Sequence, residues 1–359
     1  MTGAAAVRIH ELAIPESAGA PGWDDFVIAM GIHFGNEALS YGTDELAYTP
    51  AEALPELLDT ENQPTRLFAA WDGDRMVGMA RYEIEPGDDP QTAWLMVDVL
   101  RGARDRGVGS ALSDKLNGIA RTDGIRKAIV YAVSPYGDGE RLVSPTGHGS
   151  VPRSNPEVRF LLGKGYRLEQ VVRGSRLALP VDVSARLAAA LESTGSEYAV
   201  HTWTDRTPEH WREQMAFLRQ LMSTEEPDAG LDEPEDLWSV ERLLANEERL
   251  AASPRSLATA AVEHVPTGTL AGFTTVSVPL EADRTISQED TLVRREHRGH
   301  RLGMLLKLAN LAEAQRLHPG HPAILTFNAE ENRHMLEVNE SVGFVPFGYE
   351  GAWRRDLPA

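Results

Sequence analysis

Two stretches of sequence decide the fold: residues 95–116, LMVDVLRGARDRGVGSALSDKL, and residues 291–306, TLVRREHRGHRLGMLL. In each stretch a strand-like apolar run leads through a turn rich in arginine and glycine into an apolar helix. Glycines at a helix start let a phosphate approach the backbone, and the unpaired N–H groups and dipole of the helix favour an anion there. Each stretch therefore predicts a turn that binds a diphosphate.

The two stretches belong to an internal repeat. Three pairs of matching residues are each 194 positions apart, namely Gly78 and Gly272, Arg104 and Arg298, and Gly109 and Gly303. The pairs that close the halves, Gly165-Tyr166 and Gly343-Phe344, are 178 positions apart. The first half therefore carries an insertion, which we place in the loop from Pro135 to Ser150 because it is rich in Gly, Pro and Ser.

A duplicated chain of 359 residues predicts two domains, at residues 1–180 and 197–359, joined by a short helical linker at residues 181–196. Each half reads as a strand, two helices, three antiparallel strands, a helix, a strand, a helix and a strand. This order predicts an α+β fold, with a mixed, mostly antiparallel central sheet flanked by helices in each domain. In the second half we expect helices from Thr207, over residues 235–250 and from about Glu331.

Composition and charge exclude several classes of protein. The net charge of −19 opposes binding to nucleic acid or to an anionic membrane. The chain has no cysteine, which excludes disulfides, thiolate zinc sites and a cysteine nucleophile. The first residues lack the pattern of a secretory signal. We therefore expect a cytoplasmic protein without nucleic-acid or membrane partners.

The turn RDRGVG at residues 104–109 and the order of elements around it resemble the R/Q-x-x-G-x-G/A loop of the GCN5-related N-acetyltransferases. The resemblance covers nearly the whole chain, as a tandem of two such domains. It implies acetyl-CoA as co-substrate, with its diphosphate on the backbone amides of Arg104, Asp105, Arg106, Gly107, Val108 and Gly109. Val99, at the end of the preceding strand, is implied to present main-chain groups to the pantetheine arm.

In the second half the same positions are Val293, Arg298, Gly299, His300, Arg301, Leu302 and Gly303, and Arg301 replaces the central glycine. The resemblance also implies that the side chains of Asn328 and Asn332 bond the pantetheine or a phosphate. The alternative for these asparagines is helix capping, with Asn328 at the start of the last helix.

Acetyl transfer to an amine requires a deprotonated amine, donors for the developing oxyanion and a proton for the departing thiolate. Candidate bases are Asp98 in the first half and Glu289 and Asp290 in the second, with a solvated or ion-paired carboxylate as the alternative for each. Many relatives use a tyrosine as the acid, but the equivalent positions are Leu161 and Asn339. Water, Tyr166 or Tyr349 remain as proton donors.

We expect no metal site. The histidine pairs His297 with His300 and His318 with His321 lie in or near loops, and the chain has no HExxH motif. A further expectation is that Trp203, Trp211 and Trp238 belong to the core.

These observations predict an acetyl-CoA-dependent N-acetyltransferase that acts directly on a small primary amine, and the acidic surplus favours a cationic acceptor. The alternatives are a non-catalytic module that binds or senses acyl-CoA and a scaffold with neither turn in use. The sequence leaves open which half is catalytic and whether the chain forms an oligomer.

Overall fold

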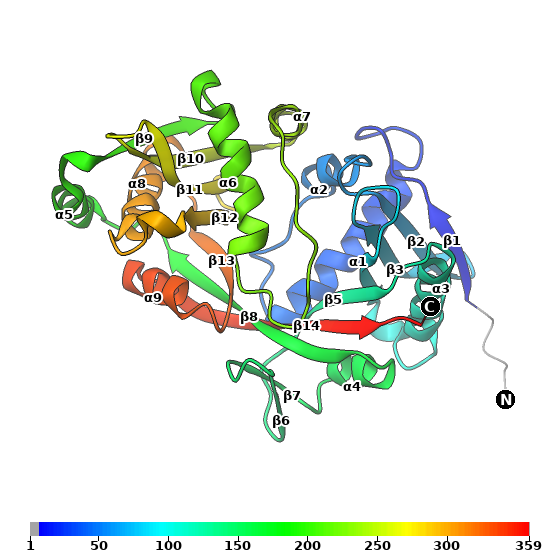
Figure 1. The fold of residues 1–359 in the computed structure, drawn as a ribbon. Helices are drawn as coiled ribbons and strands as arrows, with labels where there is room; N and C mark the ends of the chain where they lie inside the picture. Colours follow the sequence, from blue (N-terminus) through cyan, green and yellow to red (C-terminus); the bar gives the residue numbers. More distant parts are fainter. Residues whose placement is uncertain (1–6, 359) are drawn as a thin grey trace. The chain divides into compact units, whose positions relative to one another are not determined.

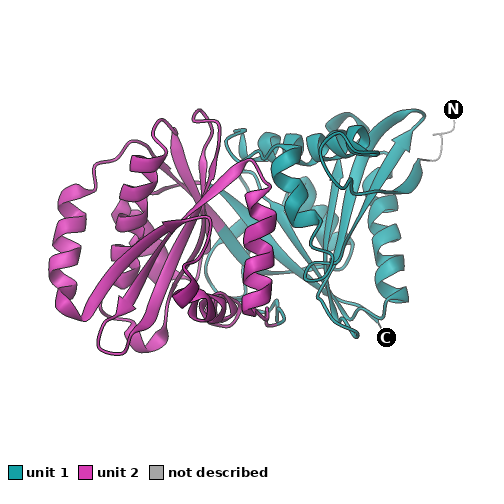
Figure 2. Ribbon diagram, turned by 90° about the horizontal axis from the view of Figure 1, so that it is seen from above, with its two compact units in different colours: residues 1–172, 228–234, 348–359 teal, residues 173–227, 235–347 magenta. Residues whose placement is uncertain are grey.

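The structure, a computed structural model, describes residues 7–358. Figure 2 colours its two compact units: unit 1 comprises the chain up to Val172 with residues 228–234 and 348–359, and unit 2 comprises residues 173–227 and 235–347. The compact units are defined by spatial contacts, whereas the expected domain boundaries follow the sequence repeat. Those boundaries therefore stay a prediction.

Unit 1 is a sheet with helices on both faces (Figure 1). Its strands lie in the order β1-β2-β3-β4-β5-β14-β8. Their bounds are β1 Arg8–Leu12, β2 Thr65–Asp72, β3 Arg75–Ile84, β4 Thr92–Val99, β5 Lys127–Val133, β14 Val345–Asp356 and β8 Arg167–Ala178. Only residues 348–356 of β14 and 167–172 of β8 belong to unit 1, and the rest of both strands belongs to unit 2. The helices are α1 Trp23–Tyr41, α2 Pro50–Leu57, α3 Val108–Thr122 and α4 Pro156–Gly163, and the expected insertion loop contains the small hairpin β6 Arg141–Val143 and β7 Ser150–Pro152.

Alternation along the strands separates the two faces of unit 1. Phe68 and Ala70 of β2 pack in the core under α3 and α4, whereas Leu67 and Ala69 pack under α1 and α2. On β4, Val97 and Val99 belong to the α3 side. Asp98 therefore faces the side covered by α1.

Unit 2 has the same plan. Its strands lie in the order β8-β13-β12-β11-β10-β9. Their bounds are β9 Tyr198–Thr204, β10 Arg255–His264, β11 Thr269–Pro279, β12 Ile286–Val293 and β13 Ala323–Ala329. The helices are α5 Ser184–Thr194, α6 Arg212–Glu225, α7 Val240–Ala251, α8 Leu302–Leu317 and α9 Arg333–Val342. Helices α5 and α8 cover one face, and α6 and α7 cover the other.

Several helix starts differ from those expected. The first helix of the second half begins at Arg212 rather than near Thr207, because a 3-10 turn precedes it. The second begins at Val240 rather than 235, where the side chain of Ser239 accepts a hydrogen bond from Arg242 N. The helix expected within residues 181–196 is present as α5, which belongs to unit 2. Trp211 is buried, and Trp203 and Trp238 are partly buried against the same core cluster.

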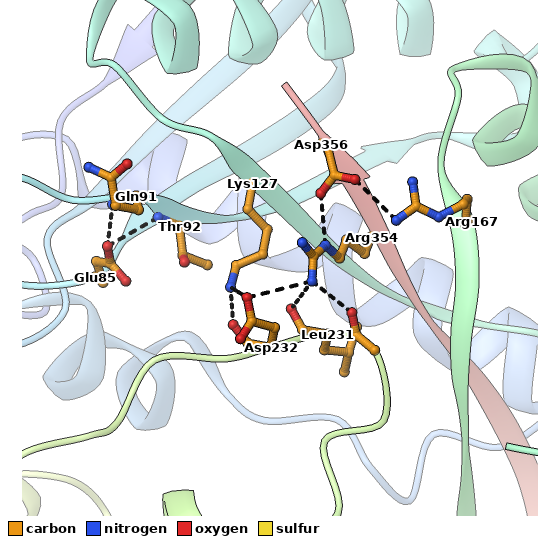
Figure 3. A network of polar contacts seen from close by, with 10 residues as sticks. Glu85, Gln91, Thr92, Lys127, Arg167, Leu231, Asp232, Arg354 and Asp356 are labelled. Carbon is orange, nitrogen blue, oxygen red and sulfur yellow. Dashed lines mark hydrogen bonds and ion pairs between the residues drawn. The ribbon is translucent and has the colours of Figure 1, made fainter. Parts of the chain in front are cut away.

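Two segments from the second half of the sequence, residues 228–234 and 348–359, belong to unit 1. The C-terminal part of β14 pairs antiparallel with β5, from Glu350 opposite Val133 to Asp356 opposite Lys127. A strap, residues 228–234, buries Leu231 against Ile129 and Ala352. Figure 3 shows polar contacts that hold the strap, in which Lys127 donates to Asp232 and Arg354 donates to the carbonyl of Leu231. Arg354 also donates to the carbonyl of Gly230.

The α+β fold with mixed sheets flanked by helices is confirmed in both units. The parallel pairs β4 with β5 and β12 with β13 sit among antiparallel neighbours. Within residues 7–358, no helix has the length and apolar character needed to cross a bilayer.

Candidate active site

The turn after β4 in unit 1 has the conformation that an anion cradle requires. Asp105 and Gly107 both have positive φ, 58° and 85°, and Gly107 is the N-cap of α3. The first intrahelical bond runs from Ala111 N to Gly107 O, so the N–H groups of the preceding residues of α3 point out of the helix start. A Cβ built on Gly107 would meet no atom within 4 Å, so the turn is open on this side.

The turn after β12 in unit 2 repeats this conformation with the glycine moved. Gly299 and Arg301 have φ of 86° and 59°, at the positions of Asp105 and Gly107. Each copy thus places one glycine and one larger residue in the left-handed region, at a cost of about 1–2 kcal/mol for the larger residue. Arg301 forms the same N-cap as Gly107, so the missing central glycine leaves the turn intact.

The first arginine of each turn, Arg104 or Arg298, connects the turn to the end of the preceding strand by a hydrogen bond. Arg104 Nε donates to Val99 O at 3.0 Å, and Arg298 Nε donates to Val293 O at 3.1 Å. A second nitrogen of each guanidinium, Nη2, donates to a helix on the other face of the sheet. Arg104 donates to Asn36 of α1, and Arg298 donates to Glu225 of α6. Both arginine side chains are therefore bonded within the protein, and the predicted binding of a diphosphate would depend on the backbone amides of the turns.

The strands separate beside each turn. The parallel pairing of β4 with β5 ends at Trp94 opposite Ile129, and that of β12 with β13 ends at Ser287 opposite Leu325. Val99 lies opposite Gly78 in a non-hydrogen-bonded pair, because Leu100 N donates to Val77 O. Its N–H and C=O are therefore directed toward the separating side.

Glycine is required at the partner position of each pair. A Cβ on Gly78 would lie 2.9 Å from Asp98 O, and a Cβ on Gly272 would lie 2.4 Å from Leu292 O. Since Arg104 and Asn36 take the carbonyl of Val99, its N–H is the group left to meet a ligand in the opening. This agrees with the predicted contact of Val99 with a pantetheine arm, which stays a prediction.

Next to this opening, unit 1 carries a histidine and a carboxylate in contact. His33 Nδ1 lies 2.8 Å from Asp98 Oδ2, and Asn36 Nδ2 donates to Asp98 Oδ1 at 3.0 Å. An ionised carboxylate only accepts hydrogen bonds, so Nδ1 carries the proton and Nε2 is the proton acceptor of the ring. Burial opposes protonation of the ring, but the hydrogen bond and charge of Asp98 outweigh it and raise the pKa of His33.

Further acidic groups continue along the same face of α1. Burial raises the pKa of Glu37 to about 7, against the opposing effect of His33. Tyr41 donates a hydrogen bond to Glu350 of β14, and burial raises the pKa of Glu350. Of these groups, only Asp98 was predicted from the sequence. The spacing of His33, Glu37 and Tyr41 at every fourth residue of one helix was the signal available.

The corresponding face of unit 2 is different. Asp290 accepts from Arg219 Nη1 at 3.2 Å, and the Arg219 guanidinium lies 5.1 Å from the ring centroid of Trp238. Glu289 is exposed at an irregularity in the pairing of β11 with β12. Of the three predicted bases, therefore, Asp98 contacts a histidine, Asp290 is ion-paired and Glu289 is at the surface.

The distal asparagines of unit 2 have separate roles. Asn332 is the N-cap of α9 and accepts from Met335 N, so the alternative of helix capping applies to Asn332 and not to Asn328. Asn328 lies within β13, and its Oδ1 accepts from Asn339 Nδ2 at 2.7 Å. Asn339 Oδ1 is buried and has no partner within the described part of the chain. An open hydrogen-bond acceptor therefore lies beside β13.

The other positions considered from the sequence, Leu161, Tyr166 and the histidine pairs, do not contact His33 or Asp98. Leu161 is buried in the core of unit 1, and burial raises the pKa of Tyr166 to about 12. His297 Nδ1 contacts the hydroxyl of Tyr198, and His321 Nδ1 contacts Arg284 O. A search of residues 7–358 finds no group of three side chains suited to a metal ion.

Comparisons with known proteins identify the fold. A family model described as the acetyltransferase (GNAT) family matches residues 37–138. A tandem GNAT protein from the clavulanic acid biosynthesis pathway is 22% identical, with coverage of 98% of this chain and 100% of its own and a TM-score of 0.70. A GCN5-related N-acetyltransferase from Sphaerobacter thermophilus is 13% identical, with coverage of 97% and 98% and a TM-score of 0.58.

A third structure is the glucosamine N-acetyltransferase region of a fungal multi-domain GH3 β-N-acetylglucosaminidase. It is 14% identical, with a TM-score of 0.62 over 98% of this chain and 38% of that chain. No curated protein sequence matches. Residues 37–138 thus match the model of the GNAT family, and the whole chain has the fold of a tandem GNAT protein. Members of this family are acyltransferases that generally use acetyl-CoA.

Proposed function

We propose that this protein is an acetyl-CoA-dependent N-acetyltransferase, and that unit 1 transfers the acetyl group directly to the amine of a small acceptor. The observation that supports this assignment most strongly is the contact of His33 with Asp98. Asp98 lies one residue before Val99, in the part of β4 that has separated from β5 next to the open turn. A proton acceptor and a cradle for the diphosphate thus lie at the two ends of one short segment.

The residues of unit 1 divide the work. The backbone amides of residues 104–109 bind the diphosphate, and the N–H of Val99 bonds the acyl end of the co-substrate. His33 Nε2 removes the proton from the acceptor ammonium, while Asp98 holds the ring in the required tautomer. The side chain of Asn36 connects these groups, because it donates to Asp98 and to the carbonyl of Val99 and accepts from Arg104. When bound, acetyl-CoA supplies the activated acyl group.

A cationic acceptor suits the side of the sheet that carries Asp98. Burial raises the pKa of Glu37, Glu83 and Glu233. At Glu83 the charge of Arg81, 3.6 Å away, opposes this rise and the charge of Glu233 adds to it. A bound cation would stabilise the ionised form of these buried carboxylates, so they favour an amine that carries positive charge. The ring of Trp94, opposite Glu83 in the β3 and β4 pairing, adds an aromatic surface.

The test is release of coenzyme A thiol from acetyl-CoA across a panel of small amines. We expect His33→Gln to lower kcat by about 10²–10⁴-fold, with the Kd for acetyl-CoA unchanged. His10→Gln, which changes an exposed histidine on β1, is the matched control. Because the pKa of His33 is raised and the base must be deprotonated, the wild-type rate should fall as pH drops through a value above 6.5.

A non-catalytic acyl-CoA sensor is the second candidate, favoured by Leu161 and Asn339 at the positions where many relatives have a tyrosine. The same panel separates the two. Binding of acetyl-CoA without turnover of any amine would support the sensor and overturn the enzyme, whereas absence of binding would overturn both.

A further inference from the structure

Unit 2 buries a lysine in its interior. Lys307 of α8 is 4% exposed, and it is one of four lysines in the chain, with Lys115, Lys127 and Lys164. Its Nζ lies 3.3 Å from Gln288 Oε1 and 5.9 Å from the ring centroid of Phe344. Ser113 occupies the matching position in unit 1, so the amine is particular to unit 2.

The surroundings of Lys307 favour an uncharged amine. Gln288 Nε2 donates to Thr275 O at 2.7 Å and to Thr274 Oγ1 at 3.0 Å, so its Oε1 is the atom left to accept from Lys307. No carboxylate contacts Nζ among residues 7–358. A buried ammonium without a counter-charge is costly, and burial lowers the pKa of Lys307 to about 7. Near neutral pH, Nζ therefore has a lone pair available for attack.

This amine lies where the strands of unit 2 separate. Gln288 comes directly after Ser287, the last residue of β12 that pairs with β13. Lys307 lies on the helix that starts at the turn of Gly299 and Arg301. On β13 the same opening is bordered by Asn328. Its partner Asn339 has a buried Oδ1 that accepts from no donor within residues 7–358. An unsatisfied buried acceptor indicates a ligand with an N–H group, such as an amide.

We propose that Lys307 is an internal acetyl acceptor: acetyl-CoA held by the turn of unit 2 acetylates Nζ. This inference rests on the proposed use of acetyl-CoA by this protein. Nζ attacks the thioester carbonyl carbon, the C–N bond forms and the C–S bond breaks. The proton lost by the nitrogen passes to the departing thiolate, which leaves as coenzyme A thiol. The product is a neutral amide, which fits a buried site without a counter-charge.

The experiment incubates the full chain with trideuteroacetyl-CoA and follows label at the four lysines by peptide mass spectrometry. Label is expected at Lys307 faster than at exposed Lys115. With acetyl phosphate, which lacks the pantetheine and diphosphate of acetyl-CoA, the order should reverse, because only exposed amines are reached. Lys307→Met should fold, since an apolar chain of similar length replaces a buried amine, and it should lose this label while small-amine turnover is unchanged.

A matched pair of turn variants assigns the label to unit 2. Gly299→Val and Gly107→Val each place a β-branched residue at a position with φ near 85°, where no neighbouring atom lies within 4 Å. Loss of the Lys307 label in Gly299→Val alone supports the proposal. Unlabelled Lys307 in a protein that turns over small amines overturns it and leaves the enzyme intact. Absence of label together with absence of turnover counts against the proposed function as well.

Discussion

The turns at residues 104–109 and 298–303 share a backbone conformation, but the side chains beside them differ. Asp105 and Gly107 of unit 1 have the same left-handed conformations as Gly299 and Arg301 of unit 2. On the face of the neighbouring sheet, however, Asp98 contacts His33, whereas Asp290 is paired with Arg219. The comparison indicates that the cradle depends on backbone geometry, which tolerates exchange of residues, while the chemistry depends on side chains that have diverged.

The largest expected effect concerns the cradles. Gly107→Val should disrupt the turn of unit 1 and remove at least two charge-assisted bonds, which costs about 4 kcal/mol or roughly a thousand-fold in affinity. Calorimetry should show one acetyl-CoA site fewer, and turnover of small amines should be lost at ordinary co-substrate concentrations. Gly299→Val should remove the other site and keep the turnover. The opposite pattern would make unit 2 the catalytic unit.

The next effect separates the two aspartates. Asp98→Asn should lower kcat by about 100-fold, because the amide no longer holds His33 in one tautomer. The pH at which the rate falls should also move down, since the charge that raises the pKa of His33 is gone. Asp290→Asn, which affects only the pair with Arg219, should leave kcat within two-fold. Equal losses in both variants would contradict the assignment of chemistry to unit 1.

The turns were accessible to sequence analysis because glycines and arginines at fixed spacing report local backbone geometry. The repeat located both copies, and even the substituted position of Arg301 keeps its conformation. The polar face of α1 was missed because the first helix was read only for its place in the element order. Glu350 and Glu233 could not be placed at all, because they reach unit 1 through pairings more than 100 residues long in sequence.

The strap allows a third, smaller test. Leu231 is 1% exposed and packs against Ile129 and Ala352. Leu231→Ala should lower the free energy of unfolding by about 2–3 kcal/mol, because it removes buried apolar surface and leaves a cavity. Leu237→Ala, which truncates a leucine that is 65% exposed, is the control and should cost little. Chemical denaturation followed by the fluorescence of Trp94 and its neighbours measures the difference. Equal effects would show that the strap does not contribute to the fold of unit 1.

The smallest effect tests the contrast between Ser113 and Lys307. The pKa of Lys307 is about 7 in the folded chain and near the ordinary lysine value when unfolded. Between these values the unfolded chain binds one proton more, so the free energy of unfolding should rise with pH by about 1.4 kcal/mol per unit. Denaturation of wild type and Lys307→Met at several pH values above 7 should show this slope in wild type only. Lys115→Met, an exposed lysine on α3, should keep it, and a slope retained by Lys307→Met would mean that Lys307 stays charged in the folded chain.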